Sequence, residues 1–474
     1  MKRTFPIGII LCLFVGVNLL NLSAQEYNNF DLSKYITPDI TRNRLDVGFN
    51  SNGNFTSNLD IEKSSLLFGQ LYSSFENIKN TRKKITTLNL SLDLNGNYTD
   101  SKNDIYTNNI SNSFNFRDRI SVSFVGKYFN VSNYFISVGT NFWMDNQFDD
   151  YNKKSDLILK LNNHNKSNDY RLMPSIGIGL GRIESVEDAR QALYLIKELT
   201  KNRVLSRELT VDETFQLAQL ISSVKNKRFL DSRLRRIEEI TSIDSFFVKN
   251  IFIEQADARY FTTLYDIWDN GALFQRKSGH VFELGFSPSI GYSSDRRNQN
   301  WFSPDSTFWS ISSRKTYGGN LSFQYELEKP INLNWQHSVK SSLGSSSYSY
   351  LSNNSHSNSE GEILSDYNTS TLYLNGTYSI GYYPNTRTNL VLGIGQYFTQ
   401  RYTSINPELP NIIGYKTKDF DSYSSIDFSI YYYISPQFRI SGTASLDYYF
   451  SNYDTYTTNR LSGEFQATIS YSLF

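Results

Sequence analysis

Residues 87–98 read TLNLSLDLNGNY, a run in which apolar and polar side chains alternate. One set of alternate positions holds Leu88, Leu90, Leu92, Leu94, Gly96 and Tyr98. The other set is polar throughout: Thr87, Asn89, Ser91, Asp93, Asn95 and Asn97. Successive side chains of a β-strand point to opposite faces. This period of two therefore predicts an extended strand with one apolar and one wet face.

The same alternation returns in Thr371–Tyr382 and Phe438–Phe450. A soluble sandwich also alternates, so two further features decide the fold class. The expected strands are long, about 10 to 20 residues, where soluble strands typically run about 5 to 6. Short connections, such as Glu328–Pro330, alternate with long polar ones, such as 350–366. This arrangement is typical of an all-β transmembrane antiparallel β-barrel from a bacterial outer membrane.

The composition agrees with a surface that faces lipid. The chain has 34 Tyr and 33 Phe, and together with Trp these aromatic residues make up 15% of it. All hydrophobic residues together make up only 39%. Barrels display such rings at the headgroup level of the membrane. Beyond the N-terminal segment no run of about 20 apolar residues exists, so we expect no transmembrane helix in the mature chain. In hydrocarbon only a closed barrel then pairs every backbone donor and acceptor.

We expect about fourteen strands, with both chain ends on the periplasmic side. They are placed near 44–57, 65–77, 84–99, 106–128, 133–146, 170–183, 279–294, 307–327, 331–349, 367–383, 387–404, 419–434, 437–450 and 459–473. The count depends on the charged triplet Arg117-Asp118-Arg119. If it is a turn and Asp156–Leu161 is a further strand, the number is sixteen. We favour fourteen, because the apolar phase continues through the triplet.

The N-terminus predicts a secretory signal peptide over residues 1–24. Lys2 and Arg3 precede an apolar run from Phe5 to Leu20, and a small-residue site ends at Ala24. The single cysteine, Cys12, lies in this segment, so the mature chain is expected to have no disulfide and no thiolate ligand. Its formal charge is 45 − 46 = −1, which gives no reason to expect a nucleic-acid partner. Residues 25–43 are expected to form a periplasmic leader or plug.

The C-terminus resembles the terminal-aromatic signal of Gram-negative outer-membrane barrels. Its alternate residues are Phe465, Ala467, Ile469, Tyr471 and Leu473, and the chain ends at Phe474, one residue out of phase. The resemblance covers some ten residues. It implies insertion into outer-membrane lipid by the barrel-assembly machinery, which is the partner expected during biogenesis.

Between the two barrel parts, 44–183 and 271–474, the period changes to 3.6. We expect an inserted α-helical domain over 184–270. Its first helix is expected to have Ser185 as N-cap, and a capping box is expected at Thr210–Glu213. A third helix near 228–248 is expected to bury Leu230, Leu234, Ile237 and Ile240. This segment carries too many charges to face lipid or to fill the lumen. We therefore place it in the periplasm.

The third helix offers candidate residues for docking a periplasmic protein or anionic lipid. They are Arg228, Arg233, Arg235 and Arg236. The alternative, which we favour, is a solvated helix face balanced by Glu238 and Glu239.

No constellation for catalysis, a metal or a cofactor stands out, so we expect a protein that is not an enzyme. Of the four histidines, His280 and His337 occupy the same alternate strand positions as the apolar residues that are expected to face outward. His164 and His356 are expected in outer loops. Acidic loop clusters lack a defined Ca²⁺ ligand spacing.

Charges that face the lumen are the remaining site candidates. By phase they are Asp93, Lys340, Asp427, Arg439, Asp447 and Glu464. The architecture resembles fourteen-stranded transporters for hydrophobic compounds that carry an N-terminal plug, an analogy of fold alone. Our leading hypothesis is a passive channel or transporter for small molecules with a helical gate or docking domain. The alternatives are a non-enzymatic assembly or secretion component that recruits a periplasmic partner, and an outer-membrane enzyme.

Overall fold

The computed structural model describes twelve stretches of the chain. They are residues 30–58, 62–103, 109–154, 161–227, 232–253, 256–271, 275–301, 307–357, 363–407, 415–435, 438–454 and 456–471. The predicted signal peptide, Arg228 and Phe474 lie outside these residues.

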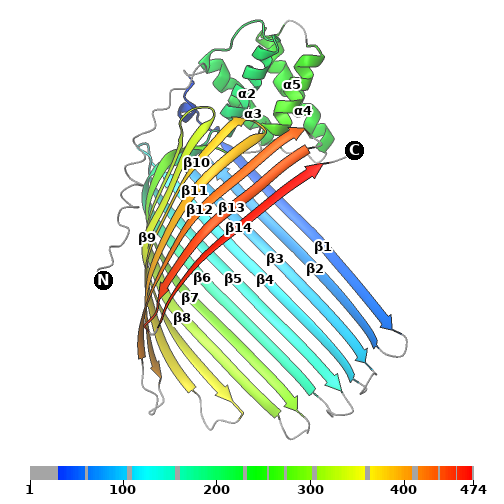
Figure 1. Cartoon of the computed structure of the whole chain (residues 1–474), viewed down its shortest axis with the longest axis vertical. Coiled ribbons are helices and arrows are strands. Elements are labelled where there is room, and N and C mark those ends of the chain that lie inside the picture. Colours follow the sequence, from blue (N-terminus) through cyan, green and yellow to red (C-terminus); the bar gives the residue numbers. More distant parts are fainter. Residues whose placement is uncertain are drawn as a thin grey trace.

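One antiparallel sheet contains fourteen strands, and each strand pairs with its neighbours in sequence (Figure 1). Their bounds are β1 Ile40–Asn58, β2 Glu62–Asn80, β3 Lys84–Asn103, β4 Asn109–Phe129, β5 Tyr134–Lys154, β6 Leu161–Ser185, β7 Lys277–Trp301, β8 Thr307–Pro330, β9 Trp335–His356, β10 Ile363–Asn385, β11 Thr388–Pro407, β12 Tyr415–Ser435, β13 Phe438–Asn452 and β14 Thr457–Tyr471. The predicted barrel fold and the strand number of fourteen are confirmed.

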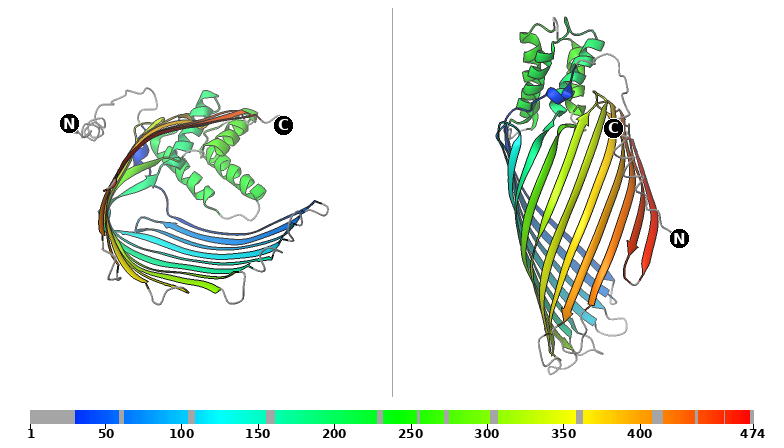
Figure 2. Two further views of the ribbon diagram at one scale, coloured as in Figure 1. Left: turned by 60° about the horizontal axis from the view of Figure 1, so that its bottom comes forward. Right: turned by 90° about the vertical axis from the view of Figure 1, so that its left-hand side faces the viewer.

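The sheet curls strongly, and its first and last strands form its two edges (Figure 2). Among the described residues β1 pairs with β2 alone, and β14 pairs with β13 alone. The short connections and the helices lie at one end of the sheet, and the long connections lie at the other (Figure 1).

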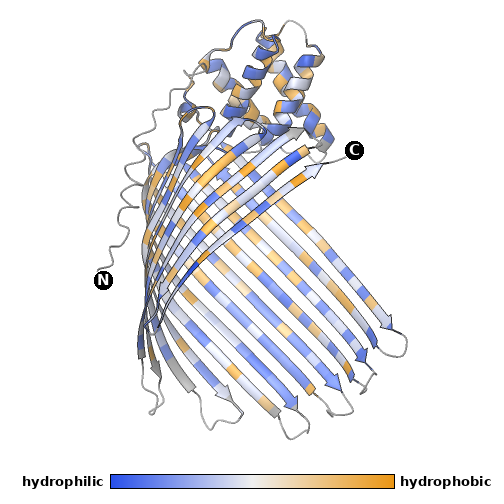
Figure 3. Ribbon diagram, in the orientation of Figure 1, coloured by the Kyte–Doolittle hydropathy of each residue, from blue (hydrophilic) through white to orange (hydrophobic). Residues whose placement is uncertain are grey.

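The two faces of the sheet differ as the alternation predicts. Leu90, Phe286 and Leu372 belong to the face whose large apolar side chains are exposed. On the other face small polar residues such as Ser289 and Thr399 are buried. Apolar and polar residues therefore alternate along nearly every strand (Figure 3). A water-soluble sheet has the opposite arrangement, so the apolar face is the lipid face. We call the polar face the inner wall.

The charged triplet 117–119 lies within β4, which settles the strand count. Arg117 pairs in register with Gln147, and Arg119 pairs with Asp145. Arg117 Nε donates to Asp145 Oδ1 at 2.7 Å on the inner wall. On the other face Asp118 accepts a hydrogen bond from Asn146 at 3.0 Å. Each charge thus has a partner on the next strand, so no turn is needed.

Four helices lie between β6 and β7: α2 (Glu187–Lys201), α3 (Val211–Lys225), α4 (Ser232–Lys249) and α5 (Ala258–Asn270). Thr210 and Glu213 form the predicted capping box of α3. The prediction of Ser185 as N-cap is wrong, because Val186 is the N-cap and makes no side-chain cap bond. None of the helices in the described residues is both long and apolar enough to cross a membrane.

The prediction for α4 is wrong in part. Leu234 and Ile237 are 55% and 57% exposed. Ile243 and Phe247 of α4 are fully buried in the common core, and Ile240 and Phe246 are partly buried against it. Leu234 and Ile237 lie in the first turns of α4, whereas α4 packs against the core mainly through its later turns. Leu230 lies outside the described residues.

Two glycines lie where β6 and β7 leave the sheet for the helices. Gly181 has φ +95° and Gly279 has φ +119°, and a Cβ on Gly279 would collide with the carbonyl oxygen of Arg182. We expect Gly279→Ala to destabilise the barrel by about 2 kcal/mol or more through backbone strain. Urea unfolding in detergent measures this loss. Gly285→Ala is the control, because a Cβ there meets only ordinary contacts. Equal midpoints for both variants would contradict the expectation.

Candidate functional site: the inner wall and its helical cap

Three of the six predicted lumen charges lie together on the last three strands. Asp427 pairs with Ser445, and Ser445 pairs with Glu464, so both carboxylates share the inner wall with Asp447. A hollow of about 290 Å³ is lined by Asp427, Ser445 and Glu464. Asp427 accepts a hydrogen bond from Ser425 at 3.0 Å, and Asp447 accepts one from Tyr423. This part of the wall is acidic and open.

The other three candidates lie apart from this group and from one another. Asp93 accepts a hydrogen bond from Gln70 at 2.9 Å. Lys340 Nζ lies 3.1 Å from Glu326 Oε1. Arg439 stacks over the ring of Tyr433 at 5.1 Å. The six residues therefore line one wall, but they do not converge on a single site.

Further ion pairs and glycines shape the wall between β4 and β7. Lys127 Nζ lies 2.6 Å from Glu283 Oε2, although the two residues are 156 positions apart in the sequence. The ring of Phe135 lies against Gly179, where a Cβ would collide with it. The glycines of β6 thus make room for a neighbouring side chain, as the alternation of glycine in this strand indicates.

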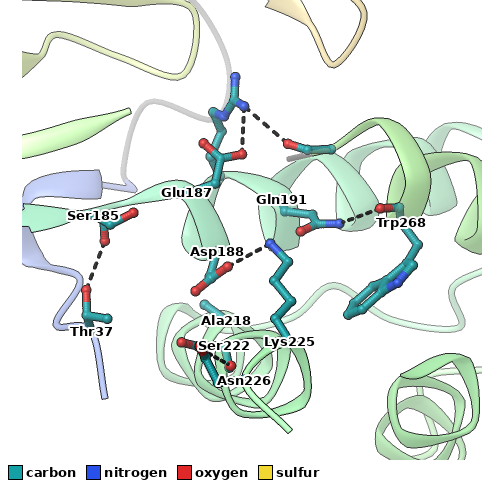
Figure 4. A network of polar contacts seen from close by, with 12 residues as sticks. Thr37, Ser185, Glu187, Asp188, Gln191, Ala218, Ser222, Lys225, Asn226 and Trp268 are labelled. Carbon is teal, nitrogen blue, oxygen red and sulfur yellow. Dashed lines mark hydrogen bonds and ion pairs between the residues drawn. The ribbon is translucent and has the colours of Figure 1, made fainter. Parts of the chain in front are cut away.

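The helices and the N-terminal segment share one hydrophobic core at the short-turn end of the sheet. A short 3-10 helix, η2 (Leu32–Lys34), precedes β1, and Leu32 and Tyr35 are buried in the core of the helices. Thr37 donates to the carbonyl oxygen of Ser185 at 3.0 Å. Figure 4 shows this bond beside the pairs Asp188–Lys225 and Gln191–Trp268. We call the N-terminal segment and the four helices together the cap.

Arg276 lies between α5 and β7 and bonds the end of the helical insertion to the barrel rim. Its side chain is 1% exposed and donates four hydrogen bonds, to the side chain of Gln336 and to the carbonyl oxygens of Asn332, Leu333 and Trp335. Its guanidinium also lies over the ring of Tyr383 at 5.3 Å. Burial, with the nearby charge of Arg190, lowers the pKa of Arg276 to about 10. The residue therefore stays charged at neutral pH and needs every one of these partners.

Arg190 is a second buried arginine beside Arg276. It is fully buried, pairs with Glu187 at 2.8 Å and donates to the carbonyl oxygen of Gly271 at 3.2 Å. Burial raises the pKa of the Glu187 carboxyl, although Arg190 opposes this. From the next turn of α2, Tyr194 donates to the carbonyl oxygen of Tyr383 on β10 at 2.9 Å. These contacts hold α2 against the rim of the barrel.

Sequence reasoning overlooked Arg276 and chose arginines of the third helix. Arg235 pairs with Glu239 at 2.6 Å, and Arg236 pairs with Asp269 across the cap. Arg233 lies on the exposed part of α4. Charge density alone points to such surface residues. The only sequence signal for Arg276 is its position directly before a strand at the end of the insertion, which is weak.

The predicted outer-loop positions of two histidines are wrong. His164 lies in β6, with Nδ1 3.1 Å from Asp150 Oδ1, and His356 is the last residue of β9. On the lipid face His337 Nδ1 lies 2.6 Å from the hydroxyl of Tyr378. The described residues contain no group of three His, Cys, Asp or Glu side chains that could hold a metal ion.

A fourteen-stranded antiparallel meander with an apolar outer face and a polar, charged inner wall defines an integral β-barrel of the Gram-negative outer membrane. No protein-family model matches this chain, and no curated protein matches it.

Several solved barrels are similar to it over most of its length. The toluene transporter TodX of Pseudomonas putida is 9% identical, with 91% of this chain and 88% of that chain covered and a TM-score of 0.25. The ferric yersiniabactin uptake receptor FyuA of Yersinia pestis is 7% identical, with coverage of 88% and 61% and a TM-score of 0.34. The transport unit of the autotransporter AIDA-I of Escherichia coli is 10% identical, with coverage of 98% and 97% and a TM-score of 0.19.

Proposed function

We propose that this barrel is a passive channel or transporter for small molecules and that the cap acts as a gate at its periplasmic end. One observation carries the proposal: a charged inner wall leads to a helical cap that is bonded to the barrel rim. The wall carries both signs of charge, so strong ion selectivity is not expected. About fourteen strands also enclose more space than side chains easily fill.

The four helices of the cap are bonded to the rim at the β8–β9 and β10–β11 connections and at β10. Arg276 bonds to the β8–β9 connection, Tyr194 to β10, and Asp266 of α5 to Arg387 in the β10–β11 turn. A cleft of about 350 Å³ separates α2 and α5 from that turn. The N-terminal segment of the cap is bonded elsewhere on the rim, because Thr37 donates to Ser185 of β6 and accepts a hydrogen bond from Arg82 in the β2–β3 turn.

Conductance in planar bilayers tests the proposal. We expect the wild-type barrel to open, and we expect a variant in which a short turn replaces 187–270 to show larger and longer openings. Heat-unfolded protein is the control for leakage of the bilayer. If neither the wild type nor the deletion variant opens, the channel proposal fails. If both have the same conductance, the gating role of the cap fails.

A second function has an observation of its own. Exposed Leu234 and Ile237 on α4 form an apolar surface next to Arg233 and Arg235, which suits recruitment of a periplasmic protein by an assembly or secretion component. A periplasmic protein that co-purifies with the wild type, and is lost with Leu234→Glu plus Ile237→Glu, would favour this function. Val211→Glu, at another exposed apolar residue of the cap, is the matched control.

A further inference from the structure

Two tyrosines of the inner wall lie flat against neighbouring strands. The ring of Tyr373 on β10 covers Gly344 on β9, where a Cβ would collide with its hydroxyl, and its hydroxyl donates to Asn320 on β8 at 3.2 Å. The ring of Tyr348 on β9 covers Gly318 on β8 in the same way. A ring that lies along the wall turns one face to the backbone and the other to the lumen. Both tyrosines are half-buried, which fits this placement.

Two arginines lie on the same face of the wall. Arg171 on β6 lies over the ring of Trp143 at 4.7 Å. Arg314 on β8 lies over the ring of Tyr367 at 5.8 Å, and Tyr367 stacks on Tyr350, whose ring lies 6.3 Å from that of Tyr348. Aromatic contacts hold both guanidiniums along the wall.

Neither arginine has an ion-pair partner among the described residues. Elsewhere on the wall Arg117, Lys127 and Lys340 each have a carboxylate. Asp169, two positions before Arg171 on the same face, lies beyond ion-pair distance of it. Arg171 Nε is buried and has no hydrogen-bond partner in the described structure. Within the described part of the wall, then, no carboxylate lies within ion-pair distance of Arg171 or Arg314.

The wall around the rings is rich in hydroxyl and amide groups. Asn320 bonds to Tyr373, and Ser346 pairs with Thr371 directly beside it. Flat ring faces bind flat apolar faces, such as the C–H face of a pyranose ring. Hydroxyl and amide side chains bind sugar hydroxyls, and free guanidiniums bind carboxylates through paired hydrogen bonds. An aromatic hydrocarbon would leave these polar groups without partners.

We infer that Arg171, Arg314, Tyr348 and Tyr373 form a binding platform for acidic saccharides, which are sugars that carry a carboxylate. The inference rests on the proposed channel function, because it names the class of solute that the lumen takes. It does not depend on conductance, because binding to the wall can be measured in detergent.

Titration with digalacturonate tests the platform, with calorimetry and the fluorescence of Trp143 as readouts. We expect Tyr373→Ala and Arg171→Gln each to weaken binding about tenfold, the loss typical of one stacking or charge-assisted contact. Tyr373→Phe keeps the ring and should bind within about threefold of the wild type. Tyr317→Ala removes a tyrosine from the lipid face and is the matched control, with no change expected. The methyl ester of digalacturonate, which lacks the charge, should bind about tenfold more weakly.

The inference is overturned if digalacturonate does not bind to the folded wild type, or if Tyr373→Ala and Arg171→Gln bind it as the wild type does. Equal affinity for the methyl ester would remove the arginines from the site. Tighter binding of naphthoate than of the saccharide would exclude recognition of hydroxyl groups. If the barrel binds digalacturonate and never conducts, the platform stands and the channel proposal fails. If the barrel conducts and does not bind digalacturonate, the channel proposal stands and the platform fails.

Discussion

Arg276→Ala should release the cap from the barrel and leave the barrel folded. The change removes four hydrogen bonds and leaves the carbonyl oxygens of Asn332 and Leu333 and the side-chain oxygen of Gln336 without this donor, whereas the carbonyl oxygen of Trp335 keeps the N–H of Ile331. A buried acceptor left without a donor typically costs about 1–3 kcal/mol, and several are affected here. The population with an undocked cap should therefore rise on the order of a hundredfold or more.

Limited digestion with proteinase K in detergent measures this release. Cleavage at the two junctions of the cap, near 186 and 271–276, should become much faster in Arg276→Ala, and the barrel should keep its folded mobility on gels. Arg207→Ala is the matched control. Arg207 also lies in the cap and pairs with Glu213 at 2.8 Å, but it is exposed to solvent, so Arg207→Ala should be cleaved at the wild-type rate. Cleavage of Arg276→Ala at the wild-type rate would show that Arg276 does not hold the cap.

The second large effect is expected at the two edges of the sheet. β1 starts at the end of the sheet that carries the helices and β14 ends there, so the two strands run antiparallel (Figure 1). Leu45 on β1 and Phe465 on β14 present exposed apolar side chains on the lipid face. Unpaired backbone groups at such edges cost several kcal/mol each in hydrocarbon. We expect β1 and β14 to pair with each other in the membrane and close the barrel.

Cysteine cross-linking tests this closure in a background that carries Cys12→Ser. Leu45→Cys is combined in turn with Leu461→Cys, Phe465→Cys or Ile469→Cys. One combination should form a disulfide in nearly all folded molecules, because a disulfide needs Cα atoms about 4.4–6.8 Å apart. Leu45→Cys with Gln466→Cys is the control, since Gln466 lies on the inner wall. If no combination cross-links in lipid, the edges stay open and the lumen is continuous with the bilayer.

The strands were predictable because each one carries its pattern locally. In Thr87–Tyr98 the alternation alone assigns both faces, and Leu90 and Asp93 lie where it places them. The triplet 117–119 was harder, since local charge suggests a turn. Its place in a strand depends on Asp145 and Asn146, which belong to the next strand.

The cap was less predictable, because helix periodicity shows a stripe and does not show what covers it. The stripe of α4 continues through Leu234 and Ile237, but the core closes around Ile243 and Phe247. Arg276 and its acceptors lie more than fifty residues apart in the sequence. Nothing local marks such a residue as buried.

The sequence by itself determined a membrane-facing sheet of long strands interrupted by a helical segment. It did so because side-chain period and strand length are local properties that lipid and water select directly. Only the tertiary structure decided which charges are neutralised and which are free, where the cap is bonded to the rim, and which glycines accept a ring. These properties depend on contacts between distant strands, whose register follows from the whole sheet.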